Sequence, residues 1–340
     1  EIYADMNVIV EFLEDGDEEL YNHINNMSEM IHDMNISVSE MSDDIEHLYD
    51  DVDHLWEVVY EMQREMDNMT EEIDEMASEM EEMQERINEL ENMTSCRLVP
   101  YSNCAGKDFN NTNLSGMDLT GINFQNAVLT EANLAGAYLR YADLTDAELY
   151  YADLTNAYLR YADLTNADLR YADLTNAELY FADLTIADLW YADLAGAYLN
   201  YADLTSADFF SADLTDADLR YADLTSAEFY IADLTDANLY GADLTNAKLD
   251  DADLTDAYLY TADLTNADLR YADLTNADLK DADLTDAYLY TADLTNADLR
   301  YADLTDAYLY NADLTNADLR YADLTDADLY GADLTNADLS

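Results

Sequence analysis

Apolar residues recur with a different period in each of three zones of the chain. In residues 1–19 they alternate with mostly polar residues, which predicts a half-buried, strand-like head. From Leu20 to Leu90 they follow an unbroken 3-4 spacing over ten heptads. From Lys107 to Ser340 they recur at every fifth position. These periods predict a head at 1–19, a coiled coil at 20–95, a cysteine-flanked hinge at 96–106 and a repeat domain at 107–340.

The heptads of residues 20–95 predict a long left-handed coiled coil. Its a positions are mainly Ile and Val and its d positions are Leu or Met, which favours a parallel dimer. Apolar residues beside the seam, such as Trp56 at e and Val58 at g, favour a trimer instead, and both alternatives stay open. The outer positions are overwhelmingly acidic, so we expect this helix to associate with copies of itself.

The five-residue zone has one large and one small apolar residue in each repeat. The repeat centres are Leu or Phe in 47 consecutive pentapeptides, from Phe109 to Leu339. From Ala127 onward, the residue two positions before each centre is always Ala. A period of five fits neither a helix nor a flat strand. It predicts a chain that turns a corner at each repeat, with both apolar side chains pointing inward.

This zone resembles the pentapeptide-repeat family, whose pattern is A-(D/N)-L-x-x. The run Ala152-Asp153-Leu154-Thr155-Asn156 is a faithful copy. The resemblance implies a right-handed, four-sided β-helix with four pentapeptides per coil and about twelve coils. The fold class is therefore an α-helical coiled coil followed by a β-solenoid. The first four repeats depart from the pattern at the inward Ala, and we expect them to form a capping coil.

Coils of 20 residues would place residues 20 apart directly above one another. Threonine and asparagine columns could then hydrogen-bond along the solenoid. Aspartates at every tenth position form like-charged columns, in which each neighbouring pair costs about 1 kcal/mol in water before screening. High salt or bound cations, Ca²⁺ among them, would relieve this repulsion, and diffuse counterions without an ordered site are the alternative. The candidate cation ladder consists of Asp143, Asp163, Asp183, Asp203 and Asp223.

Aromatic residues form further columns on the same register. Tyrosine offers flat area with a polar tip, so we interpret these columns as contact faces for assembly. One column contains Tyr141, Tyr161, Phe181, Tyr201 and Tyr221, and part of another contains Tyr290, Tyr310 and Tyr330. The apolar residues of the head are candidate assembly residues too: Ile2, Met6, Val8, Val10 and Phe12.

The charge of the chain limits its partners. It contains 77 acidic and 13 basic residues and has a formal net charge of −64, which argues against non-specific binding to nucleic acid or to anionic membranes. Its apolar runs are shorter than a membrane span. All four histidines lie in the coiled coil, and the repeats single out no acid, base or nucleophile, so we expect neither an enzyme nor an organic cofactor.

Several signals favour the outside of a cell. Cys96 and Cys104 predict a local disulfide in an oxidising compartment, with free thiols or interchain bonds as the alternative. The chain starts at Glu1, which we expect to reflect a removed leader or a fragment. Glycosylation sequons lie at Asn26, Asn35, Asn68, Asn92, Asn110 and Asn113.

The leading functional hypothesis is an extracellular or cell-surface structural protein that forms a fibre, filament, sheath or surface layer. One alternative, implied by the family resemblance, is an acidic DNA mimic that inhibits DNA gyrase. Another is the shaft and tip of an adhesin or viral fibre. The pattern ends without a changed sequence at Ser340, so we also expect the head to dock on the last coil of another copy, as a head-to-tail polymer.

Overall fold

The computed structural model describes residues 26–28 and 96–340. The chain divides into two units, Glu1–Glu91 and Asn92–Ser340. Residues 26–28 are helical. The predicted head and nearly all of the predicted coiled coil lie outside the described residues, together with Asn35, Asn68 and Asn92. The coiled coil, the head and the proposed docking of the head therefore stay predictions.

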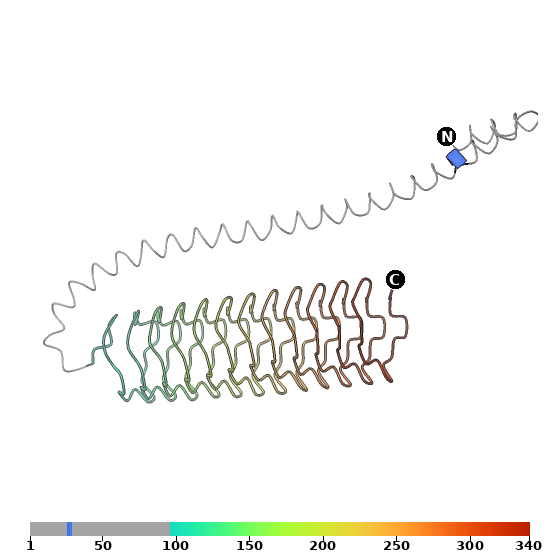
Figure 1. Ribbon diagram of the computed structural model, residues 1–340. Coiled ribbons are helices and arrows are strands. Elements are labelled where there is room, and N and C mark those ends of the chain that lie inside the picture. Colours follow the sequence, from blue (N-terminus) through green and yellow to red (C-terminus); the bar gives the residue numbers. More distant parts are fainter. Residues whose placement is uncertain (1–25, 29–95) are drawn as a thin grey trace, which may run out of the picture. The chain divides into compact units, whose positions relative to one another are not determined.

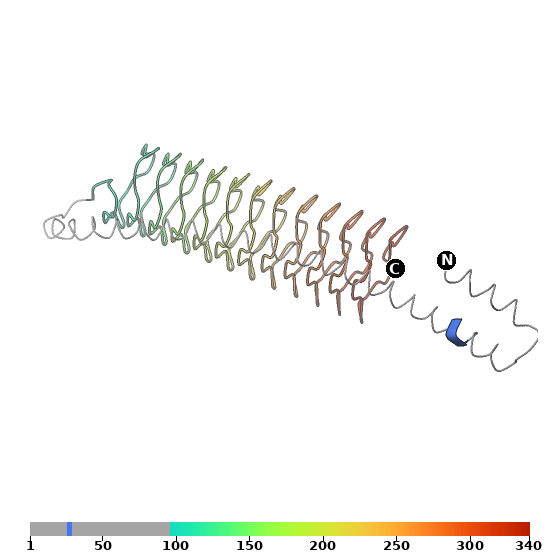
Figure 2. The same cartoon turned by 90° about the horizontal axis from the view of Figure 1, so that it is seen from above.

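Residues 96–340 form a β-solenoid whose coils stack along one axis (Figures 1 and 2). Isolated parallel β-bridges, not extended strands, hold the coils together. Each bridge joins residues 20 apart, and a bridge occurs at every fifth residue, from Asn103↔Asn123 to Asp318↔Asp338. Four bridges per coil give each coil four sides. The four-sided β-helix that the family resemblance implies is confirmed.

One pentapeptide, residues 142–146, shows how the backbone is satisfied. The Asp143, Leu144 and Asp146 N–H groups donate to carbonyls of neighbouring coils at 2.9, 2.6 and 3.0 Å. The Ala142 N–H donates to the Leu139 carbonyl in a turn at 3.0 Å. The Thr145 N–H donates to the Asp143 carboxylate at 3.1 Å. All five N–H groups have acceptors, so the aspartate before each centre supplies the one acceptor that the backbone does not.

The interior is filled by the two apolar columns that the repeat predicts. From Ala127 to Leu319 the inward Ala, Leu and Phe side chains are at most 2% exposed. Where Phe replaces Leu in successive coils, the rings of Phe209 and Phe229 stack in the core with centroids 4.7 Å apart. This continuous core, together with the bridges, makes each coil a support for the side chains of its outer rows.

The solenoid begins earlier than the predicted boundary at residue 107. The Tyr101 N–H donates to the Thr120 carbonyl at 2.8 Å, and Asn103 bridges Asn123. Cys104 takes an inward position and is fully buried. Residues 96–106, predicted as a hinge, are thus part of the first coil. The five-residue pattern missed them because Ser102 and Cys104 stand there in place of Ala and Leu.

Candidate interaction surface

Each pentapeptide gives two residues to a corner of the coil, and the second of them has a positive φ. This angle is 56° at Asn156, 58° at Tyr161 and 51° at Ile231. The left-handed region suits Gly, Asn and Asp and is unfavourable for other side chains, β-branched ones above all. A coil has four corners, five residues apart. Corners that are ten residues apart in sequence are therefore diagonally opposite.

Two diagonally opposite corners are polar, and we call them the threonine corners. They begin at Thr145 and Thr155 and repeat every 20 residues, mostly as Thr followed by Asn, Asp or Ser. The Asp153 carboxylate accepts the Thr155 N–H at 3.0 Å and its hydroxyl at 2.6 Å. Asparagines bond from coil to coil as predicted: Asn296 donates to Asn276 at 3.1 Å, and Asn316 donates to Asn296 at 3.2 Å.

A third corner, the tyrosine–arginine corner, comprises residues 140–141, 160–161, 180–181, 200–201 and 220–221. Its second positions form the aromatic column that the sequence predicts, from Tyr141 to Tyr221. Successive ring centroids are 5.0–5.3 Å apart and the planes are within 14° of parallel. Its first positions include Arg140, Arg160 and Arg220. The Arg160 guanidinium lies 4.6 Å from the centroid of the Tyr180 ring.

The fourth corner, diagonally opposite, is the aromatic corner, residues 150–151, 170–171, 190–191, 210–211 and 230–231. Its rings form one connected chain. Tyr151 stacks on Tyr171 at 4.9 Å, and Tyr171 stacks on Tyr191 at 5.0 Å. Trp190 and Tyr230 contact the ring between them, Phe210, at 5.1 and 5.5 Å. The most exposed side chains of this corner are Tyr151, Tyr171, Trp190, Tyr191, Tyr230 and Ile231, at 39–49%.

The row that precedes the aromatic corner is acidic: Glu148, Asp168, Asp188, Asp208 and Glu228. Arg170 binds Asp168 with an Nη2–Oδ2 distance of 2.6 Å and lies 3.4 Å from Asp188. Lys248 of the following coil binds Glu228 at 2.5 Å. Burial raises the pKa of the Asp188 carboxyl above its usual value. This corner therefore keeps a net negative edge.

The columns of the candidate cation ladder form as predicted, since Asp143, Asp163 and Asp183 bridge in series. Each of these carboxylates accepts the N–H two residues further on, at 2.9–3.1 Å. Within residues 26–28 and 96–340, no group of three or more His, Cys, Asp or Glu side chains is arranged to hold a metal ion. Weak binding of cations along the column, Ca²⁺ included, stays a prediction.

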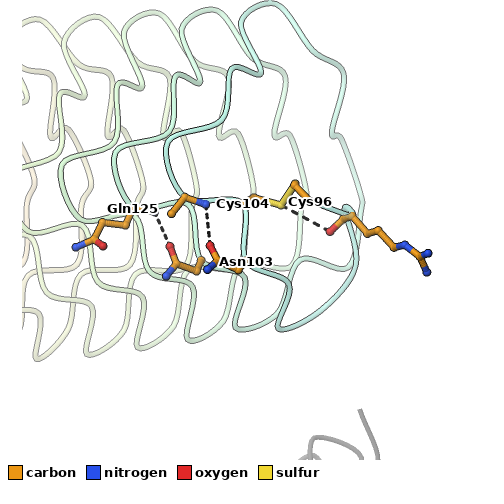
Figure 3. The surroundings of a disulfide bond; sticks show 7 residues. Cys96, Asn103, Cys104 and Gln125 are labelled. Carbon is orange, nitrogen blue, oxygen red and sulfur yellow. Dashed lines mark hydrogen bonds between the residues drawn. A yellow bond between two sulfur atoms is a disulfide. The ribbon is translucent and has the colours of Figure 1, made fainter. Parts of the chain in front are cut away.

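The N-terminal end of the solenoid contains a disulfide between Cys96 and Cys104, with Cα atoms 4.8 Å apart (Figure 3). It ties the start of the first coil to a fully buried inward position. Of the six sequons, Asn110 and Asn113 lie in the first coils and are exposed. Asn26 lies in the helical residues 26–28 and is exposed too.

The structure adds a surface that the sequence analysis missed. The aromatic corner combines two neighbouring columns, such as Trp190 with Tyr191, whereas the predicted contact faces are single columns. A signal was present, because Tyr151, Tyr171 and Tyr191 recur every 20 residues. The predicted column of Tyr290, Tyr310 and Tyr330 continues the same edge, with Tyr290 and Tyr310 stacked at 5.1 Å.

A four-sided solenoid built from five-residue turns defines a class of repeat protein. The family of pentapeptide repeats matches residues 108–146, 147–185, 177–216, 212–251, 262–300 and 302–340, and the chain belongs to this family. No curated protein matches the chain. Among the described residues, no helix is long and apolar enough to cross a membrane.

Solved pentapeptide repeat structures resemble the chain to different extents. HetL of the cyanobacterium Nostoc, which is involved in regulating heterocyst differentiation, is 38% identical; the match covers 64% of this chain and 89% of HetL, with a TM-score of 0.38. Trypsin-treated QnrB1, a plasmid-mediated fluoroquinolone resistance protein, is 17% identical over 71% and 91% of the two chains (TM-score 0.27). A thylakoid-lumen protein of Arabidopsis thaliana is 32% identical over 31% and 66% (TM-score 0.20).

Proposed function

We propose that this protein is a non-catalytic structural protein that works as an assembly of its own copies. The observation that carries the proposal is the repetition of the outer rows. The same hydrogen-bonded or stacked side chains recur every 20 residues around a filled core, as in the bridged series Asp143, Asp163 and Asp183. An active site needs a few residues in an arrangement unlike their surroundings. A surface that repeats along the solenoid axis instead suits many similar contacts, whose binding energies add up over the length of the solenoid.

The assembly has two parts in this proposal. The heptads of residues 20–95 associate as a parallel dimer or trimer, and the solenoids present their corners to further copies. The site of action is extracellular or on a cell surface, supported by the Cys96–Cys104 disulfide and by exposed sequons at Asn110 and Asn113. Extended fibres, sheaths and layers are the forms that such a unit can build.

The test is the size and shape of the full chain. Light scattering and electron microscopy should detect multimers of this protein alone at micromolar concentration. A monomer at every concentration up to tens of micromolar would contradict the proposal. Expression in a secretory host should add mass that peptide N-glycosidase removes, and Asn113→Gln should remove part of that mass. An unmodified chain would contradict the assignment to the outside of the cell.

A second candidate is an acidic DNA mimic that inhibits DNA gyrase, which the family resemblance and the aspartate columns favour. Columns such as Asp143, Asp163 and Asp183 space negative charge regularly along a rod, as phosphates do. The full chain would then inhibit DNA supercoiling by purified gyrase at a stoichiometric concentration. Supercoiling that continues unchanged at a large excess of the chain would eliminate this candidate.

A further inference from the structure

Two opposite corners of the solenoid carry complementary surfaces over the same coils. We propose that a second copy of this chain packs beside the first, with its tyrosine–arginine corner against the aromatic corner. This inference rests on the proposed structural function and names the contacting surfaces. Because the two corners lie on opposite sides, each copy would be left with one corner available. The contact is heterologous and extends into an open row of solenoids.

Exposure marks the aromatic corner as a contact surface. Tyr151, Tyr191 and Ile231 are 49, 46 and 44% exposed and lie in one edge that rises through five coils. Contiguous exposed apolar side chains are uncommon on soluble chains and mark interaction sites. On a chain with a net charge of −64, a run of exposed aromatic side chains stands out further from its surroundings.

Corner geometry does not explain these side chains. Ile231 combines a φ of 51° with an exposed β-branched side chain, which is unfavourable for the backbone and for hydration alike. Asn311 stands in the same column at a φ of 57°, so asparagine makes this corner without strain. Tyrosines such as Tyr171, with a φ of 58°, are likewise less favourable at this corner than asparagine. The fold itself would be served by Asn, Asp or Gly, as at the threonine corners.

The packing of the rings indicates the kind of partner. In both corners the rings of a column stack on each other, as Tyr171 does on Tyr191 and Tyr161 on Phe181. Their faces are covered by neighbouring rings, so the edges are the part of each ring that remains for a contact. Sugars and nucleic-acid bases bind aromatic faces, so stacked columns suit them poorly. Ring edges suit the π faces, carbonyls and side chains of another protein surface.

The charges of the two edges indicate that the protein partner is a second copy of this chain. Over residues 148–231 the aromatic corner and its preceding row contain five acids and Arg170, and Lys248 pairs with one of the acids. Within residues 148–231 this edge therefore has a net charge of four negative. Over residues 138–221 the tyrosine–arginine corner and its preceding row contain three arginines against Glu178 and Asp218, a net charge of one positive. The two edges span the same coils, so copies placed side by side need almost no axial shift to match.

Salt conditions follow from the charge of the whole chain. The remaining faces of two copies, including the aspartate column from Asp143 to Asp223, repel one another, whereas the two edges attract. At about 0.15 M salt the Debye length is about 8 Å, so repulsion between distant faces is screened while groups in contact still interact. Lateral association is therefore tested at physiological ionic strength.

Cysteine cross-linking tests which corners meet. The sequence has two cysteines, and both are in the disulfide, so an added cysteine is the single free thiol. Phe181→Cys places a thiol on the tyrosine–arginine corner, and Tyr191→Cys places one on the aromatic corner; both positions are exposed. The full-length variants carry different tags, are mixed, and are treated with a short bifunctional thiol reagent. The expected product is the mixed dimer, in about tenfold excess over either homodimer.

Homodimers of one variant in equal or greater yield, or no linked product, would overturn the inference. A wild-type chain that forms multimers but gives no linked product leaves the structural function standing and removes only this interface. A wild-type chain that is monomeric contradicts both.

A pair of matched substitutions tests the energetics. Ile231→Asn removes an isoleucine that is 44% exposed from the aromatic corner, and Ile186→Asn removes one that is 56% exposed from a threonine corner. Asparagine occupies the same columns at Asn311 and Asn166, so both variants keep a corner that this chain already forms. Ile231→Asn should raise the concentration needed for lateral association by about tenfold, and Ile186→Asn should leave it unchanged. Equal effects from the two variants would overturn the interface.

Discussion

The ring of Tyr221 lies over the backbone of Gly241, at the point where the aromatic column of the tyrosine–arginine corner ends. A β-carbon at Gly241 would come within 2.9 Å of two carbons of this ring. Every earlier member of the column, from Tyr141 on, instead stacks on the ring of the next coil. Gly241 therefore accommodates the last ring, and its φ of +62° makes glycine suitable for the corner as well.

A matched pair of glycine substitutions separates these two roles. Gly241→Ala and Gly136→Ala share the same φ of +62°, but a β-carbon at Gly136 meets nothing within 4 Å. Both should lose about 1 kcal/mol from the left-handed backbone. Gly241→Ala should lose more, because the Tyr221 ring must also move. Thermal melting of the full chains measures the difference, and equal melting midpoints would show that the ring makes no tight contact with the glycine.

The aspartate columns combine a favourable hydrogen bond with an unfavourable charge. The Asp183 carboxylate accepts the Thr185 N–H at 2.9 Å and stands between Asp163 and Asp203 in the ladder. Asp183→Asn keeps an acceptor and removes the charge, so it should raise the melting midpoint at low ionic strength. Asp183→Ala removes both, and the lost hydrogen bond should cost about 1 kcal/mol.

Thermal melting in low salt, with and without millimolar Ca²⁺, separates the contribution of the hydrogen bond from that of the charge repulsion. Ca²⁺ should stabilise the wild-type chain more than the Asp183→Asn variant if cations associate with the column. Indistinguishable midpoints for the Asn and Ala variants would mean that the hydrogen bond contributes nothing. Ca²⁺ without effect on the wild type would leave the column without a specific counterion.

The repeat made the core predictable from sequence and left the corners less so. Inward Ala and Leu follow from side-chain size at fixed spacing, so the sequence alone predicts that Leu144 and Ala152 point inward. The role of aspartate was missed because like charges in a column suggested ions. The structure instead shows Asp143 as the acceptor for a corner N–H. The aromatic corner was missed because it depends on two columns that meet only once the corner is folded.

The disulfide tests how far the first coil depends on a covalent link. Cys96→Ala breaks the bond and leaves Cys104 as an apolar thiol at its buried position, whereas Cys104→Ser places a hydroxyl there. Loss of a disulfide that closes a short loop costs about 3 kcal/mol, and burial of an unpaired hydroxyl adds to this. Repeats contact only their neighbours, so the loss should stay near the first coil.

Hydrogen exchange measures that range directly. Amides near Tyr101 and Asn103 should exchange faster in Cys96→Ala, and faster still in Cys104→Ser. Amides of distant coils, such as that of Asp263, should keep their wild-type protection. Faster exchange along the whole solenoid would contradict the local effect and indicate a single cooperative unit.

The response to pH should pass through a maximum, because two groups of carboxylates have opposite pKa shifts. Burial raises the pKa of Asp188 and Asp278. Hydrogen bonds lower the pKa of Asp318, mainly from the Arg320 guanidinium, and that of Asp323, mainly from the Thr325 side chain. A carboxyl with a raised folded pKa binds its proton first in the folded state. Its contribution to stability therefore rises as pH falls through that pKa and becomes constant below the unfolded value of about 3.9.

For Asp318 and Asp323 the sign is reversed. Their contribution is complete above about pH 3.9 and is lost as pH falls through the lowered folded pKa. The melting midpoint at constant ionic strength should therefore rise as pH falls from 7 to about 4 and decrease at lower pH. Asp278→Asn keeps the acceptor for the Lys280 N–H, which Asp278 binds at 3.1 Å, and should raise the midpoint at pH 7 and flatten the rise. A midpoint that falls steadily from pH 7, or an Asp278→Asn profile identical to that of the wild type, would show that burial of this carboxyl does not govern the response.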